Sequence, residues 1–121
     1  MDFNTIPAKQ LNDYIGKYNT VIIDLREEEE YMKGHIPTAV NIPYERLEHY
    51  GNKLNKYNEI ILYCDRGSSS LLAARSLSKL GYKVINIYGG FHSYRGRVST
   101  EMNYLWNLNW RMRESVLILN R

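Results

Sequence analysis

Cysteine is almost absent from this sequence, because only Cys64 among its 121 residues carries a thiol. A single cysteine cannot form an internal disulfide, so the sequence predicts a protein of a reducing, cytoplasmic compartment. Long hydrophobic runs are absent too. No apolar stretch approaches the roughly 18–20 residues that a membrane span needs, so no membrane partner is expected. The first four residues have neither the basic start nor the apolar core of a signal peptide.

Acidic residues are scarce in the second half of the chain. Residues 1–65 contain 7 Lys and Arg against 11 Asp and Glu, whereas residues 66–121 contain 9 against 2. A basic half favours a nearby anion, although a solvated basic face explains the same counts. The length fits one domain. A composition with 44% hydrophobic and 24% charged residues is ordinary for a globular protein and argues against a disordered or fibrous chain.

Short apolar runs alternate with stretches of helical spacing. The β-branched runs at 21–23, 60–63 and 84–87 predict buried strands, and residues 39–43 predict a further extended segment. Helices are expected at 8–15, 45–54 and 70–80, and the four glutamates at 27–30 predict the solvated start of a short helix. Alternating strands and helices predict an α/β fold with a parallel sheet flanked by helices.

The only cysteine lies at the point where the 60–63 strand gives way to a Gly/Ser loop and then a helix. Ligands of parallel sheets bind outside the carboxyl ends of strands, where loop N–H groups and a helix N-terminus attract anions. A thiolate at Cys64 would be stabilised there, which favours a nucleophile that is reactive at neutral pH. On position alone, a buried structural cysteine is equally compatible with this pattern.

The residues around this loop resemble the rhodanese family of single-domain sulfurtransferases, over roughly residues 5–97. The first matching block is Ile23-Asp24-Leu25-Arg26, Glu30-Tyr31, Gly34-His35-Ile36-Pro37, Ala39 and Asn41-Ile42-Pro43. The second is Ile61-Leu62-Tyr63-Cys64, Gly67-Ser68-Ser69, Ala73-Ala74, Leu77 and Leu80-Gly81-Tyr82, and the third is Tyr88-Gly89-Gly90-Phe91. The resemblance implies a rhodanese-like domain at 1–98, built on a five-stranded parallel sheet flanked by helices.

The resemblance also implies a mechanism. Cys64 would take a sulfane sulfur from thiosulfate or another donor as a persulfide and pass it to a thiophilic acceptor, in a covalent two-step route without a cofactor. The partners would be a small sulfur-containing anion and a thiol acceptor, including a protein thiol. The catalytic residue is then Cys64, and the residues expected to bind substrate are Asp65, Arg66, Gly67, Ser68 and Ser69. Asp24 and Arg26 would support the site, by orienting the loop or by pairing with each other.

The loop departs from the family at one position. Many rhodaneses carry arginine at the sixth loop position, counted from the cysteine, whereas this chain has Ser69. The only cation inside the loop is Arg66, so thiosulfate would be held less firmly or in another geometry. A cysteine-dependent phosphatase or arsenate reductase needs an arginine one position later to clamp an oxyanion, and that position is Ser70. A non-catalytic persulfide carrier or interaction module is the other alternative.

Other features give weaker signals. His35, in a Gly-His-Ile-Pro segment, is expected to bond to backbone in a turn. His49, His92 and one cysteine do not have the spacing of metal ligands, so no metal is expected. Tyr94, Arg95 and Arg97 either border the site or lie on the surface. The aromatic residues near Arg111 and Arg113 could stack on bases, but no binding motif accompanies them, so nucleic acid is not an expected partner.

The C-terminal extension, residues 99–121, lies outside the resemblance. Apolar and polar residues alternate from Met102 to Met112, which predicts a strand, and residues 116–119 are a second candidate. Such a hairpin would be marginal alone in water. The sequence therefore predicts that the extension associates with its own domain or with a second copy of the chain.

Overall fold

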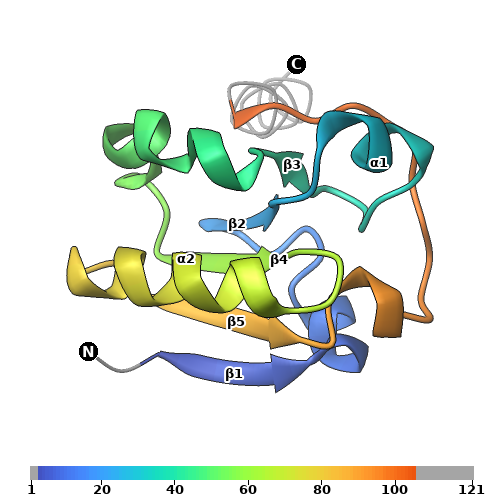
Figure 1. Cartoon of the computed structure of the whole chain (residues 1–121), viewed down its shortest axis with the longest axis horizontal. Coiled ribbons are helices and arrows are strands. Elements are labelled where there is room, and N and C mark those ends of the chain that lie inside the picture. Colours follow the sequence, from blue (N-terminus) through green and yellow to red (C-terminus); the bar gives the residue numbers. More distant parts are fainter. Residues whose placement is uncertain (1–2, 106–121) are drawn as a thin grey trace, which may run out of the picture.

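Five parallel strands form one sheet in the computed structural model, which describes residues 3–105. The strand order is β1-β5-β4-β2-β3 (Figure 1). The strands are β1 (Asn4–Pro7), β2 (Thr20–Asp24), β3 (Val40–Asn41), β4 (Glu59–Tyr63) and β5 (Val84–Tyr88). The predicted five-stranded parallel α/β fold is confirmed. Because β4 and β5 point the same way, their carboxyl ends meet at the edge on the right of Figure 1.

Two α-helices and two 3₁₀ helices connect the strands, and a third 3₁₀ helix follows β5. They are α1 (Glu28–Lys33), α2 (Ser68–Lys79), η1 (Ala8–Asp13), η2 (Tyr44–Leu54) and η3 (Phe91–Ser93). The three glutamates in the first turn of α1 complement its positive end, as expected. The helices predicted at 8–15 and 45–54 are present as 3₁₀ turns. They still bury apolar residues against the sheet, including Leu11 and Leu54.

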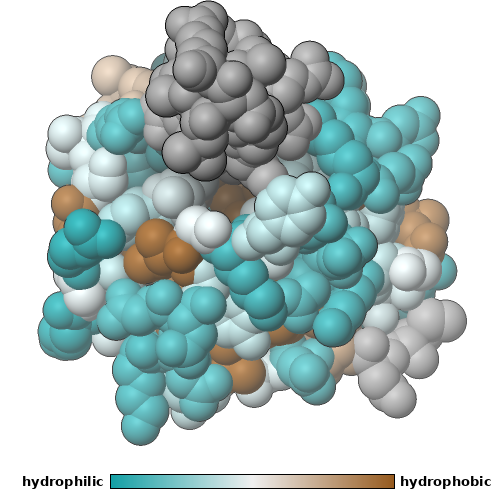
Figure 2. All heavy atoms as spheres, turned by 180° about the vertical axis from the view of Figure 1, so that it is seen from behind, coloured by the Kyte–Doolittle hydropathy of each residue, from teal (hydrophilic) through white to brown (hydrophobic). Residues whose placement is uncertain are grey.

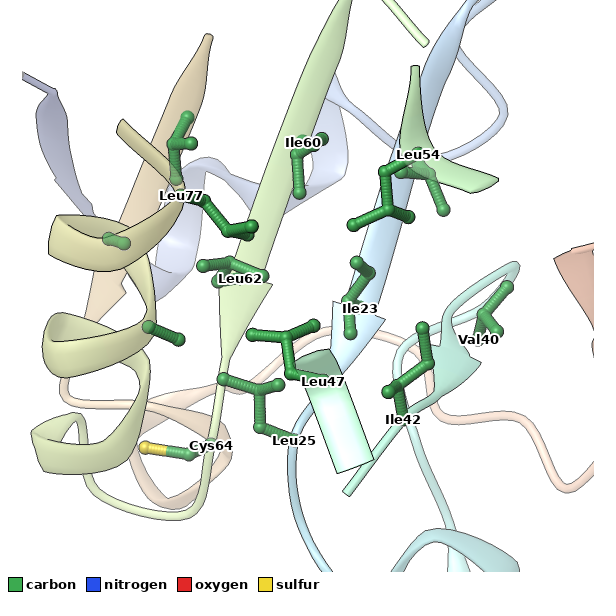
Figure 3. Close-up of a cluster of buried hydrophobic side chains, with 14 of the residues drawn as sticks. Ile23, Leu25, Val40, Ile42, Leu47, Leu54, Ile60, Leu62, Cys64 and Leu77 are labelled. Carbon is green, nitrogen blue, oxygen red and sulfur yellow. The ribbon is translucent and has the colours of Figure 1, made fainter. Parts of the chain in front are cut away.

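The sheet is buried on both faces, and neighbouring residues of a strand serve opposite faces. Ile23 of β2 and Leu62 of β4 belong to the cluster on the side of α2 and η2 (Figure 3). Ile22 and Ile61 belong to the cluster on the other side, with η1 and α1. This arrangement explains why β2 and β4 are continuous apolar runs. Cys64, at the end of β4, is part of the first cluster, so a packed core fixes its position.

Residues 99–105 pack onto the domain and do not form the predicted strand. Ser99 pairs with His35 through two backbone hydrogen bonds, but residues 102–104 have no regular secondary structure. The N–H of Asn103 donates to the Tyr31 hydroxyl, and its side-chain amide donates to the carbonyl of Ala39. Asn103 is thus buried while Tyr104 is exposed, the reverse of the expected alternation. The rest of the predicted hairpin lies outside the described residues.

The face opposite α2 is mostly hydrophilic where coloured atoms are visible, and its apolar patches are small and separate (Figure 2). Within residues 3–105, no helix combines the length and the apolar character that crossing a membrane requires.

Candidate active site

Two backbone N–H groups point at the sulfur of Cys64. The residue follows β4 directly, and its side chain turns toward α2 (Figure 3). The N–H groups of Gly67 and Ser70 donate to Sγ, with N to Sγ distances of 3.1 Å and 3.4 Å. They belong to the loop and to the first turn of α2, so the dipole of the helix adds to the effect. The arrangement favours negative charge on the sulfur, whether as thiolate or as persulfide.

Ser70 completes this cradle with its side chain. It is fully buried, and its Oγ lies 3.6 Å from Cys64 Sγ. In the thiol form, Cys64 donates to Oγ and the Ser70 hydroxyl donates to the carbonyl of Gly67. A hydroxyl hydrogen can rotate, so the same group can donate to a thiolate. From the sequence, Ser70 served only as an argument against a phosphatase, and its contact with the Cys64 sulfur was not predicted. A polar residue on the buried face of α2, with Ala73, Ala74 and Leu77, was the available signal.

The turn after β5 fixes the cysteine loop through backbone hydrogen bonds. The N–H groups of Phe91 and His92 donate to the carbonyls of Cys64 and Asp65, each at 2.9 Å. Gly90 has a φ of +57°, and a Cβ there would lie 2.5 Å from both carbonyl oxygens. Only glycine permits this approach. The family resemblance includes both glycines of this turn, but the sequence does not reveal that Gly90 allows the close backbone approach.

Gly67 lets the loop curl back toward the same turn. Its φ of +113° is in the left-handed region, and a Cβ there would lie 3.2 Å from the backbone nitrogen of Gly89. The expected small loop is therefore packed against backbone and is not simply flexible.

A buried ion pair lies below the site, at the end of β2. Arg26 Nη2 is 2.8 Å from Asp24 Oδ2 and also donates to the carbonyl of Gly34. The Tyr63 hydroxyl donates to the same Asp24 oxygen at 2.5 Å. The sequence analysis left two roles open for Asp24 and Arg26, and the structure shows them paired. Since Tyr63 directly precedes Cys64, the pair also fixes the start of the cysteine loop.

Burial sets the electrostatics of this network. It raises the pKa of Tyr63 well above the usual value, and the neighbouring Asp24 carboxylate adds to the effect. For Arg26, burial opposes the charge, but the hydrogen bonds and attraction of Asp24 outweigh it and raise the pKa. The Arg26 guanidinium also lies 4.1 Å from the centre of the Phe91 ring. Arg26 is thus a permanent cation, and Asp24 already balances its charge.

Cys64 opens into a cleft of about 450 Å³. The predicted residues that line it are Arg26, Cys64, Asp65, Arg66, Ser68 and Ser69. Gly67 does not line the cleft but donates its N–H to the Cys64 sulfur. Asp24 does not line the cleft either, because it is fully buried. Leu25, Glu27, Glu30, Tyr44 and Glu45 also line the cleft and were not predicted. Glu27 and Glu30 had been interpreted only as part of a solvated helix start.

Arg66, the only cation in the loop, points into solvent. Its side chain is 69% exposed, and its Nε lies 3.6 Å from Asp65 Oδ2. The pair is therefore loose and weak. His35 is buried away from the cleft, and its ring nitrogens lie 2.7 Å from the carbonyl oxygens of Tyr31 and Glu101, as expected for a turn histidine. No group of three or more potential metal ligands occurs within residues 3–105.

A cysteine loop that follows a strand at the carboxyl edge of a five-stranded parallel sheet is the arrangement expected of the rhodanese-like class. This chain belongs to the rhodanese-like family, because the model of the rhodanese-like domain matches residues 7–97. A putative sulfur carrier protein of Bacillus subtilis, YrkF, is 44% identical over 77 residues, which are 63% of this chain and 42% of that protein. The chain thus spans less than half the length of this relative.

Two further relatives match over a larger share of their length. The thiosulfate sulfurtransferase GlpE of Coxiella burnetii is 30% identical over 101 residues, which are 83% of this chain and 94% of that protein. The crystal structure of a rhodanese-related protein from Thermoplasma volcanium superposes with a TM-score of 0.73 at 27% identity. The superposition covers 82% of this chain and 100% of that one, which agrees with the single α/β domain described above.

Proposed function

We propose that this protein is a sulfurtransferase that carries sulfane sulfur on Cys64 as a persulfide. The observation that carries the proposal is the sulfur itself, which two N–H groups hold at the base of an open cleft. A persulfide places its negative charge one atom further out, where the remaining loop and the cleft can receive it. The name of the GlpE relative supports the reaction, and the name of YrkF supports the carried intermediate.

The reaction proceeds in two halves. The Cys64 thiolate attacks the outer sulfur of thiosulfate or another donor. A new S–S bond forms on Cys64, the donor's S–S bond breaks, and the rest of the donor leaves with the bonding electron pair, as sulfite from thiosulfate or as a thiolate or shorter polysulfide from another donor. An acceptor thiolate or cyanide then attacks the terminal sulfur, and Cys64 departs as a thiolate. No electrons enter or leave, so the residues of this chain suffice without a redox partner. A cytoplasmic compartment suits this chemistry, because the thiols must stay reduced.

Intact mass spectrometry tests the proposal. Treatment with thiosulfate or inorganic polysulfide should add one sulfur atom, and cyanide should remove it. Cys64→Ser is the control and should gain nothing. Absence of the added mass with both donors would contradict the proposal. Repeated turnover with thiosulfate and cyanide would favour an enzyme, whereas loading by polysulfide alone, without turnover of thiosulfate, would favour a carrier that needs a protein partner.

The phosphatase alternative has less support. Its chemistry needs a guanidinium fork at the position of Ser70, but the Ser70 hydroxyl instead bonds within the loop. Of the two guanidiniums that line the cleft, Arg26 is engaged with Asp24, and Arg66 is on the loop's exposed side. Neither stands where the clamp would be required.

We also propose that the C-terminal extension beyond Leu105 associates with a second copy of the chain. Light scattering of the full chain and of a chain ending at Leu105 tests this. The shorter chain keeps the contacts of Asn103 and the buried Leu105, so only later residues are removed. Equal monomeric masses at high concentration would contradict a dimer.

A further inference from the structure

The mouth of the Cys64 cleft carries more negative than positive charge. Four carboxylates line it, and they come from three separate segments of the chain. They are Glu27 and Glu30 around α1, Glu45 in η2, and Asp65 in the loop. The lining also contains two guanidiniums, Arg26 and Arg66. Glu27, Glu30 and Glu45 are exposed, so their charge faces any molecule that enters.

Neither guanidinium balances the three glutamates. Arg26 is buried, and Asp24 directly below neutralises it at 2.8 Å. Arg66 lies beside Asp65, the acid of its own loop. Lys33 outside the cleft is 3.8 Å from Glu30, but its side chain is 76% exposed and the contact is weak. Ser69 brings no charge where a loop cation would counter the acids. The mouth thus repels a dianion and attracts a cation.

We infer that the physiological acceptor is a thiol with positive charge next to its sulfur, and that Glu27, Glu30 and Glu45 select it. This inference rests on the proposed persulfide chemistry. Loading Cys64 moves the negative charge from its own sulfur to the outer sulfur of the persulfide, so the preference for a cationic thiol acts at the atom that the acceptor attacks. The acceptor thiolate attacks the terminal sulfur, its new S–S bond forms as the Cys64 S–S bond breaks, and the proton of the acceptor thiol goes to water.

Two sources could supply such a thiol, a small aminothiol or a cysteine flanked by basic residues in a protein. Cysteamine and 3-mercaptopropionate are small probes that differ in the sign of their charge. Capped peptides with one lysine or one glutamate next to a single cysteine make the same comparison, at the same charge, for a protein segment. Each thiol is compared between variants, so its intrinsic reactivity cancels.

The decisive experiment measures the second half-reaction alone. The full chain is loaded with sulfur, the loading is verified by mass, and decay of the persulfide is followed at low salt. The test variant is Glu27→Gln/Glu30→Gln/Glu45→Gln. The control is Glu28→Gln/Glu29→Gln/Glu48→Gln, which changes net charge equally at exposed residues that do not line the cleft. One unit charge within a Debye length in water changes a rate about twofold to threefold.

The test variant should therefore react about tenfold more slowly with a cationic thiol and faster with an anionic one, and both effects should shrink as salt rises. The control should change these rates less than the test variant does, because its three carboxylates do not line the cleft. A larger effect for the lysine peptide than for cysteamine identifies a protein acceptor, and the reverse identifies a small aminothiol. Equal changes in the two triple variants, or equal effects on both signs of thiol, would overturn the inference while leaving the persulfide intact. Failure to load Cys64 would instead overturn the proposed function.

Discussion

Two Asp–Arg ion pairs flank Cys64, and they differ in almost every physical respect. Asp24 and Arg26 lie below the site, 2.8 Å apart, with side chains 0% and 7% exposed. Asp65 and Arg66 lie in the loop above it, 3.6 Å apart, with side chains 65% and 69% exposed. The lower pair is held by further hydrogen bonds to Tyr63 and Gly34, whereas the upper pair faces solvent. The comparison indicates that the buried pair, at the floor of the site, stabilises the fold, whereas the exposed pair, at its mouth, contributes little to stability.

The largest effect should come from breaking the lower pair. Asp24→Asn leaves the Arg26 charge buried without its partner, which should lower the free energy of unfolding by about 3–5 kcal/mol. The matched variant Asp65→Asn should change it by less than about 0.5 kcal/mol, because solvent screens the exposed pair. Urea unfolding of both variants measures the difference. Similar losses of stability would contradict the division into floor and mouth.

A comparable effect is expected at the turn that supports the floor. Gly90→Ala places a methyl group against the carbonyls of Cys64 and Asp65, and it should destabilise the protein by about 3 kcal/mol and disturb the cysteine loop. Gly81→Ala is the control, because Gly81 has a φ of +97° but no atom within 4 Å of its Cβ position. Backbone strain alone should cost about 1–2 kcal/mol there. Unfolding curves and the rate of Cys64 alkylation report both effects.

A smaller effect, with a pH signature, is expected for Tyr63→Phe. The variant removes a donor to Asp24 and an acceptor of the Ile36 N–H, which should cost about 1–3 kcal/mol at neutral pH. In the wild type, the raised pKa of Tyr63 means that the folded state holds its proton longer than the unfolded state. Wild-type stability should therefore fall as the pH rises above about 10, and the gap to Tyr63→Phe should shrink there. A constant gap from pH 8 to pH 11 would contradict this assignment.

The smallest effect belongs to the upper pair. Arg66→Ala removes the loop cation from an exposed position, so it should raise KM for thiosulfate about twofold to threefold with little change in stability. Persulfide transfer to a thiol should change less, since the cation serves the binding of the donor. Steady-state kinetics with separate measurement of each half-reaction checks this. Equal losses in both halves would mean that Arg66 shapes the loop instead.

The parts of the fold that the sequence predicts are those with strong local patterns. β2, β4 and β5 are rich in buried aliphatic residues because helices cover both faces of the sheet, so their existence could be predicted. β1 could not, because half of its four residues are polar and it pairs only with β5 at the sheet edge. β3 lies within the extended segment predicted at 39–43, but its two residues are too few for a periodic signal, so its bounds could not be predicted.

The site likewise contains a part that a local sequence pattern predicts and a part that it does not. The nucleophile and its loop are contiguous in sequence, so the motif around Cys64 predicted them. The cleft could not be predicted, because Glu27, Glu30 and Glu45 reach it from segments that the sheet topology brings together. The failed strand at 102–104 has a related cause. The buried partners of Asn103 are Tyr31 and Ala39, far away in sequence, and tertiary contacts outweigh local alternation.

The backbone bonds between the cysteine loop and the turn after β5 have a consequence for biosynthesis. Residues 64–70 leave the ribosome before Phe91 and His92, whose N–H groups hold the carbonyls of Cys64 and Asp65. A nascent chain that ends before this turn lacks the brace that fixes its only thiol. The geometry of the cysteine loop is thereby tied to synthesis of the turn after β5, and a translation fragment that ends before residue 90 would lack a fixed Cys64 loop.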